Sequence, residues 1–314
     1  MATRHARVII LGSGPAGYTA ALYAARAGHK PLLLTGVQKG GQLVTTSTIE
    51  NWPAEHAAVL GIDLMERFEE QAVRFGTEIL FDEIASVTLA ERPFRLTGAE
   101  GEYTCDALII ATGATAKYLG LPAEQRFLGR GVSTCATCDG YFFKGQPVAI
   151  VGGGGTAVQE AIDLSNIASS VTLIHRRDEF TADAVLVERL MQRVNQGRIT
   201  LALNQEVEDI LGSDAGVTGV RLRSTDGATR DLAVTGVFIA IGHQPNTALF
   251  RGALDMDAAG YLLTRGGPGP GATVTNIEGV FAAGDVQDPT YRQAVTATGS
   301  GCQAALDAGW FLDG

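Results

Sequence analysis

The sequence predicts an α/β protein with two mostly parallel sheets, and three observations support this. Its 314 residues are about twice the length of a typical domain. An apolar strand, a glycine turn and an Ala-rich helix occur twice, as VIILGSGPAG at 8–17 and VAIVGGGGTA at 148–157. Apolar runs that end in glycine recur at 107–114, 237–242 and 279–285. This pattern is typical of three-layer, Rossmann-like dinucleotide-binding domains.

The order of these elements divides the chain into two units. The first glycine turn opens a unit of residues 1–114, and the second unit covers residues 118–243. The strand at 279–285 and a helix over 291–312 return to complete a sheet. If they join the first unit, it consists of 1–114 and 247–314, with the second domain inserted in it. The short linkers 114–118 and 243–247 would then allow a hinge. Residues 78–97 and 200–223 alternate as antiparallel meanders do.

Composition excludes several classes of protein. With 46% hydrophobic and 18% charged residues the chain can bury a core, and its net charge of −10 argues against binding nucleic acid. No apolar run reaches the ~18 residues of a membrane span, so we expect a soluble, cytoplasmic protein without a membrane partner. A zinc ribbon would need a second cysteine pair besides Cys135 and Cys138, and the five histidines are scattered, so no metal site is expected.

The first glycine turn has the spacing of a dinucleotide site. Gly12 permits the tight bend, Gly14 lets the backbone approach a pyrophosphate, and Gly17 lets helix and strand pack closely. The pyrophosphate would then lie on backbone N–H groups at the helix N-terminus. A plain tight turn between strand and helix is the alternative. The strand, turn, helix and next strand (31–36) all follow in the required order, which favours nucleotide binding.

Two dinucleotide sites in one chain suggest FAD plus NADPH, and the first unit fits FAD. Its second strand ends without the acidic residue that often binds a ribose, and a glycine segment (35–42) follows that could wrap the adenosine half. Asp285 could bind a ribitol hydroxyl. It precedes a helix that includes residues 292–294, and the positive N-terminus of this helix would favour reduced flavin. The alternative is that Asp285 is a capping residue in an ordinary turn. The predicted FAD residues are Gly12, Ser13, Gly14, Pro15, Ala16, Gly17, Thr35, Gly36, Gly40, Gly41, Gln42, Leu43, Asn51, Ala111, Thr112, Gly113, Gly284, Asp285, Arg292, Gln293 and Ala294.

The second unit carries the residues expected for NADPH. Its second strand ends at His175, followed by Arg176 and Arg177, where an acid would select NAD and arginines suit the 2′-phosphate of NADP. The alternative is a solvated basic pair at a strand end. The predicted NADPH residues are Gly152, Gly154, Gly155, Thr156, Ala157, His175, Arg176, Arg177, Ile241 and Gly242.

Cys135 and Cys138 form a CxxC between the two glycine turns. This spacing lets two sulfurs meet in one helical turn, and a helix start lowers a thiol pKa, so the pair suits disulfide exchange. Asp139 adjoins it and could carry the proton that each exchange requires. Two inert buried thiols and half a zinc site are the alternatives. Cys105 and Cys302 are expected in the core of a strand and a helix.

These motifs together resemble low-molecular-weight bacterial thioredoxin reductases. The likeness rests on GSGPAG (12–17), GGQL (40–43), ENWP (50–53), ATGA (111–114), CATCDG (135–140), GGGGTA (152–157), HRR (175–177) and FAAGDV (281–286). The resemblance implies an FAD homodimer that passes electrons from NADPH through flavin and the cysteine pair to thioredoxin. It also implies that Cys138 faces the flavin, Cys135 attacks the thioredoxin disulfide, and Asp139 is the acid/base.

The same resemblance implies that Arg130 and the aromatic residues Tyr141, Phe142 and Phe143 meet thioredoxin, although core packing explains Phe143 equally well. Because a protein substrate cannot reach cysteines that lie against a flavin, we expect the NADPH domain to rotate on the linkers.

The alternative function is that of a flavin disulfide reductase or oxidase of the same fold with another donor or partner, such as ferredoxin or a dedicated thioredoxin-like protein. A non-catalytic sensor is disfavoured by the CxxC.

Three positions depart from the family pattern. Gly155 stands where Asn is frequent, Gln159 replaces a Glu, and Thr181 stands where the family pattern HRRxxxR has its third Arg. One phosphate donor is therefore missing, and a charged hydrogen bond is worth about 1.5–3 kcal/mol. We predict that NADPH is still preferred over NADH, but by a smaller margin than in relatives.

Overall fold

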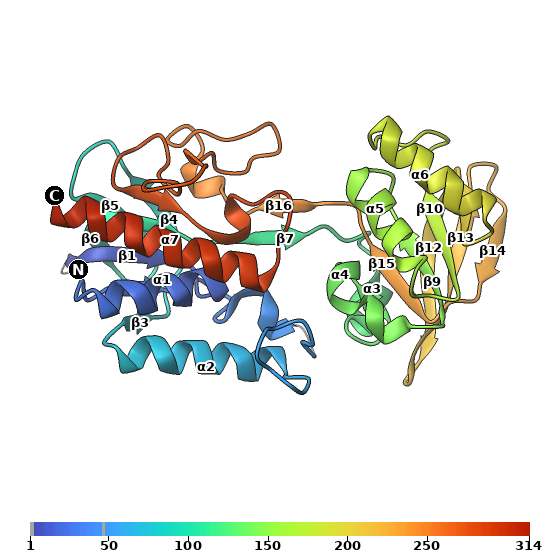
Figure 1. The fold of residues 1–314 in the computed structure, drawn as a ribbon, viewed down its shortest axis with the longest axis horizontal. Helices are drawn as coiled ribbons and strands as arrows, with labels where there is room; N and C mark the ends of the chain where they lie inside the picture. Colours follow the sequence, from blue (N-terminus) through green and yellow to red (C-terminus); the bar gives the residue numbers. More distant parts are fainter. Residues whose placement is uncertain (1–2, 46–47) are drawn as a thin grey trace. The chain divides into compact units, whose positions relative to one another are not determined.

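The computed structural model describes residues 3–45 and 48–314. The chain forms two compact units, Met1–Thr115 with Gln244–Gly314 and Ala116–His243, so the second is inserted in the first (Figure 1). Both contain parallel sheets flanked by helices, which confirms the predicted fold class.

The first unit contains a seven-stranded sheet in the order β3-β2-β1-β6-β5-β4, with β17 also on β6. The neighbours β3–β2, β2–β1, β1–β6 and β6–β17 pair in parallel. The strands β4, β5 and β6 form an antiparallel meander. The long β6 pairs with β5 through its first half and with β17 through its second half. The strands are β1 (Arg4–Leu11), β2 (Leu32–Leu34), β3 (Glu78–Leu80), β4 (Ile84–Thr88), β5 (Phe94–Gly98), β6 (Glu102–Ile110) and β17 (Val280–Ala282).

Alternation along β1 builds a core on each face of this sheet. Val8 and Ile10 pack among the small residues of the helices, while Ile9 and Leu11 pack on the opposite face against residues such as Phe250. α1 and α7 lie side by side, with α2 beside α1 (Figure 1). The helices are α1 (Pro15–Arg26), α2 (Gly61–Arg74) and α7 (Ala294–Asp313), with 3-10 turns η1 (Gly41–Thr45), η3 (Ala248–Phe250) and η4 (Gly284–Val286).

The second unit has a five-stranded sheet in the order β11-β10-β9-β15-β8, in which every pairing is parallel. Helices cover one face, and an antiparallel sheet β12-β13-β14 packs on the other. The strands are β8 (Val132–Ser133), β9 (Pro147–Val151), β10 (Ser170–His175), β11 (Ile199–Leu203), β12 (Gln205–Ser213), β13 (Gly216–Ser224), β14 (Thr229–Leu232) and β15 (Gly236–Ile239). The helices are α3 (Pro122–Phe127), α4 (Ala136–Asp139), α5 (Gly155–Leu164) and α6 (Ala184–Asn195), with the 3-10 turn η2 (Gly140–Phe143).

Four expectations from the sequence are wrong in detail. Residues 78–80 and 199–203 belong to parallel strands, β3 on β2 and β11 on β10, so each meander begins later than predicted. Arg292 and Gln293 precede α7 rather than lying in it, because the Asp288 carboxylate accepts three backbone N–H groups and holds 288–292 as a turn. Cys302 is half-buried on α7 and not a core residue, whereas Cys105 is buried on β6.

The two connections between the units pair with each other as β7 (Ala114–Ala116) and β16 (His243–Pro245). The amide of Lys117 donates to the carbonyl of Gly242 (3.0 Å), and that of Asn246 donates to Gly113 (3.0 Å). The Asn246 side chain also bonds Thr112 and Thr115, so it fixes the end of this ribbon on the first unit. Within residues 3–45 and 48–314, no helix combines the length and apolar character that a membrane crossing needs.

Candidate active site

The predicted FAD residues of the first unit converge on one edge of its sheet. β1, β2, β6 and β17 are parallel, so their carboxyl ends meet there. The amides of Gly12, Ala111 and Ala283 each bond the end of the neighbouring strand, at 2.8, 2.8 and 2.9 Å. The Asn51 amide reaches the Gln293 side chain (3.5 Å), which brings these two distant segments to the same place.

The glycines of the first turn have two different physical roles. Gly12 has φ +104°, and a Cβ there would overlap the Ala111 carbonyl; a Cβ at Gly17 would overlap the Gly12 carbonyl. Gly14, in contrast, has φ −72° and nothing within 4 Å of its Cβ position. Gly12 and Gly17 allow the chain to pack on itself, and Gly14 leaves an open approach to backbone N–H groups. The turn therefore fits a dinucleotide pyrophosphate.

A half-buried carboxylate lies just after β17. Burial raises the pKa of Asp285 to about 6, with Asp288 adding to the rise and Arg292 opposing it. A carboxylate placed away from water requires hydroxyl or N–H partners. Gly284, with φ +77°, turns the chain so that Asp285 follows directly after the strand. This position suits a polyol such as the ribitol of a flavin.

The second glycine turn repeats the arrangement of the first. A Cβ at Gly152 would overlap the Ala240 carbonyl, whereas the Cβ positions of Gly154 and Gly155 approach only Thr181 and Leu186, at 3.8 and 3.9 Å. The N-terminus of α5 is therefore open at Gly154 and Gly155. Among the predicted residues, Ile241 and Gly242 follow β15 at the same sheet edge. This edge fits a second dinucleotide.

The segment after β10 folds back onto this turn. The Thr181 amide donates to the Gly153 carbonyl (2.8 Å), and the His175 ring stacks on Phe180 with centroids 5.6 Å apart. Burial lowers the pKa of His175, which keeps its ring neutral. Both ends of the segment are thus fixed, and Arg176 and Arg177 lie exposed between them.

Cys135 and Cys138 are joined by a disulfide at the start of α4. Cys135 is the N-cap of this helix, and its sulfur accepts the Cys138 amide (3.2 Å). The same N–H would stabilise a Cys135 thiolate once the bond is reduced. α4 follows β8, which is parallel to β15, so the disulfide lies at the same edge of the sheet as the second glycine turn.

Polar groups that the sequence did not single out surround the disulfide. The Ser133 hydroxyl accepts the Cys135 amide (3.0 Å), and Glu160 on α5 accepts the Ala136 amide (3.4 Å). Burial raises the pKa of Asp139, and a hydrogen bond from Ser133 opposes the rise. The raised pKa makes this carboxyl a candidate to give and take the proton of disulfide exchange. No local pattern marks Ser133 or Glu160, because their partners are set by packing.

The aromatic residues after the CxxC separate into two groups. Phe143 packs edge-on against Phe238 with centroids 5.4 Å apart, so it belongs to the core. Tyr141 and Phe142 remain 63% and 40% exposed. Arg130 is also exposed, and its guanidinium bonds the Arg126 carbonyl (2.6 Å). Tyr141 and Phe142 therefore offer apolar surface beside the disulfide.

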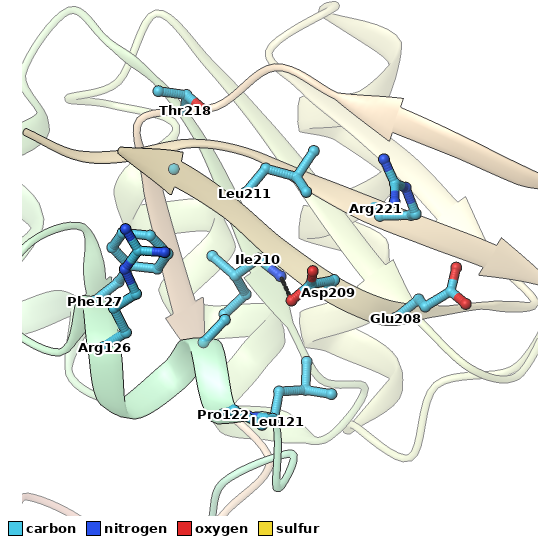
Figure 2. A pocket seen from close by; sticks show the side chains of 12 residues that line it. Leu121, Pro122, Arg126, Phe127, Glu208, Asp209, Ile210, Leu211, Thr218 and Arg221 are labelled. Atoms are coloured by element: carbon cyan, nitrogen blue, oxygen red, sulfur yellow. Dashed lines mark hydrogen bonds between the residues drawn. The ribbon is translucent and has the colours of Figure 1, made fainter. Parts of the chain in front are cut away.

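A groove of about 870 Å³ in the second unit is lined by none of the predicted cofactor or catalytic residues (Figure 2). It lies between α3 and β12–β13, with Arg126 and Phe127 on one side and Glu208 and Arg221 on the other (Figure 2). Two of its charged side chains are already paired, Arg221 with Asp231 and Glu208 with Arg223. Within the described ranges, no group of three His, Cys, Asp or Glu side chains could hold a metal ion. The groove is thus separate from both glycine turns and from the disulfide.

Two dinucleotide turns and a redox-active disulfide define the class of flavin- and nucleotide-dependent disulfide reductases. The sequence profile of the pyridine nucleotide-disulphide oxidoreductases matches residues 6–301, and the chain belongs to this family. It is 59% identical to a thioredoxin reductase of Vibrio cholerae (99% of this chain, 98% of the relative). It is equally similar, 59% over 99% of this chain and 97% of the relative, to a Pseudomonas fluorescens protein named glucosaminate ammonia-lyase. A solved thioredoxin reductase from Giardia duodenalis shares 41% identity with a TM-score of 0.93, covering 99% of this chain and all of that one.

Proposed function

We propose that the protein is an NADPH-dependent thioredoxin-disulfide reductase. The Cys135–Cys138 disulfide carries the proposal, because it lies at the sheet edge of one dinucleotide turn and beside exposed aromatic side chains. Full-length similarity to proteins named thioredoxin reductase supports the choice of substrate.

The first unit would hold FAD and the second NADPH. In the first, the turn at 12–17 would bind the pyrophosphate, residues 35–43 the adenosine half, and Asp285 a ribitol hydroxyl, with residues 51, 111–113 and 292–294 completing the site. In the second, 152–157 would bind the pyrophosphate, and Arg176 and Arg177 the 2′-phosphate. The bound flavin would supply the electron pair, taken from NADPH, that opens the disulfide.

The reduced cysteine pair would transfer two electrons to the substrate by thiol–disulfide exchange. The Cys135 thiolate, stabilised by the Cys138 amide, attacks one sulfur of the thioredoxin disulfide and releases the other as a thiolate. Asp139 gives that leaving thiolate its proton. The Asp139 carboxylate left by this transfer takes the proton of the Cys138 thiol, and Cys138 then attacks Cys135. The second thioredoxin sulfur leaves as a thiolate and receives that proton, which frees dithiol thioredoxin and restores the internal disulfide.

Alternation between flavin and thioredoxin requires movement of the cysteine pair. We infer that the NADPH domain, 118–243, rotates on the linkers 114–118 and 243–247 against the FAD domain, 1–114 with 247–314. The paired strands β7 and β16 support this, because two short connections in a single ribbon restrict the motion to a hinge. A cytoplasmic homodimer is the assembly that the family resemblance implies.

Anaerobic spectroscopy tests the proposed activity. We expect NADPH to bleach the flavin absorbance of the holoprotein, and oxidised thioredoxin to restore it. The Cys138→Ser variant should still bleach but should not pass electrons to thioredoxin. Bleaching by reduced ferredoxin and not by NADPH would instead support the alternative donor.

The Pseudomonas relative's name provides a second reaction to measure. Ammonia released from glucosaminate, independent of the cysteine pair, would contradict the reductase proposal. We expect none, because the Cys135–Cys138 disulfide and both glycine turns are the parts of an electron-transfer chain.

A further inference from the structure

Residues 36–45 fold over the first glycine turn as a short loop. The Gly40 amide donates to the Ser13 hydroxyl (3.0 Å), and Ser13 donates to the Thr35 carbonyl (3.3 Å). A Cβ at Gly41 would lie 2.9 Å from the Gly14 Cα, so the loop is in close contact with the turn. The loop therefore borders the place where a dinucleotide would lie.

A chain of three side chains ties this loop to the two helices behind it. Lys39, next to Gly40, pairs with Glu69 of α2 at 2.7 Å between Nζ and Oε1. The other oxygen of Glu69 accepts the hydroxyl of Tyr18 on α1 (3.0 Å). Tyr18 is only 1% exposed. One carboxylate thus connects the loop and both helices.

This network gives the loop a specific charge-dependent anchor. The hydroxyl of a buried Tyr needs a partner, and Glu69 provides it, so the carboxylate is held in place from the protein side. Lys39 is the exposed member, with its side chain 51% accessible. Breaking the Lys39–Glu69 pair would loosen the outer side of the loop without disturbing the core.

We propose that Lys39, Glu69 and Tyr18 form a latch that holds residues 36–45 closed over the first glycine turn and slows release of the dinucleotide bound there. This rests on the proposed function, in which that turn holds FAD. The latch positions the loop and takes no part in electron transfer. Because Lys39 is exposed and Glu69 is only half-buried, salt screens their pair, and high ionic strength weakens the latch.

The rate of FAD release tests the latch. Holoprotein is diluted, and the rise in fluorescence of released FAD is followed at 0.05 and 0.5 M KCl. Exposed ion pairs are weak, so we expect Lys39→Met to release FAD about three- to fivefold faster at low salt and to lose the salt dependence of the wild type. Arg4→Met, which breaks the Arg4–Glu78 pair at the opposite end of β1 from Gly12, should behave as the wild type.

A second variant separates a latch from a general loss of surface charge. Glu69→Gln keeps an acceptor for Tyr18 but loses the ion pair, so its release rate should match that of Lys39→Met, and the double variant should be no faster. Additive effects, or wild-type release by Lys39→Met, would overturn the latch while leaving the flavin site intact. A wild type that takes up no FAD would overturn the flavin assignment, and the latch with it.

Discussion

Adding one methyl group at Gly12 or at Gly14 should have opposite consequences. At Gly12 an Ala would need φ +104° and would overlap the Ala111 carbonyl, which the sheet holds in place. The backbone conformation costs about 1–2 kcal/mol and the overpacking about 1–3 kcal/mol. Gly12→Ala should therefore lose about 2–5 kcal/mol of unfolding free energy.

Gly14→Ala should fold almost normally and bind FAD poorly. Its φ of −72° is ordinary for Ala, and its Cβ meets no protein atom within 4 Å. Replacing Gly by Ala at a helix N-cap costs less than about 1 kcal/mol. The methyl group would nevertheless fill the approach to the backbone N–H groups, and we expect at least a tenfold loss of FAD affinity, about 1.4 kcal/mol.

Urea unfolding of the apoproteins and FAD titration separate these two effects. Trp52 and Trp310, the two tryptophans of the chain, both belong to the first unit, so their fluorescence reports its unfolding. The reasoning fails if Gly14→Ala is as unstable as Gly12→Ala. It fails equally if Gly14→Ala binds FAD as tightly as the wild type.

Three further predictions concern charge and protons. Thr181→Arg should raise the preference for NADPH over NADH, measured as the ratio of kcat/KM values, about tenfold, because it adds a hydrogen-bond donor to the 2′-phosphate. Equal rates of the wild type with both nucleotides would contradict the NADP assignment. The pKa of about 6 at Asp285 means that the folded apoprotein binds more protons than the unfolded chain between pH 4 and 6. Its stability should therefore fall across that window relative to Asp285→Asn, by about 3 kcal/mol at most, in urea titrations at each pH. Ser133→Ala removes a bond that lowers the pKa of Asp139, so the pH–rate limb set by Asp139 should move to higher pH.

The sequence predicts the parallel sheets well because strand, turn and helix follow one another locally. The first turn ends at Gly17 and α1 runs over Pro15–Arg26, much as its Ala-rich pattern indicates. Three-residue strands carry too little pattern to reveal their partners. The sequence therefore predicts β3 as part of a meander, although β3 pairs in parallel with β2.

Long-range side-chain contacts are the part of the site that no local pattern contains. Glu160 lies 24 positions from Ala136, and Glu69 lies 51 positions from Tyr18, so only the packing of α4 on α5 and of α1 beside α2 brings them together. Asn246 is similar, because its role depends on β7 and β16 pairing across the whole inserted unit. The glycine turns and the CxxC can be recognised in the sequence because each motif is complete within a few residues.

Mapping the thiols formed after one equivalent of NADPH tests most directly whether the cysteine pair carries the electrons. Anaerobic holoprotein would be alkylated before and after NADPH, and the labelled cysteines located by mass spectrometry. We predict new labels on Cys135 and Cys138 that disappear when oxidised thioredoxin is added. Thioredoxin reduction while both residues remain joined would contradict the account.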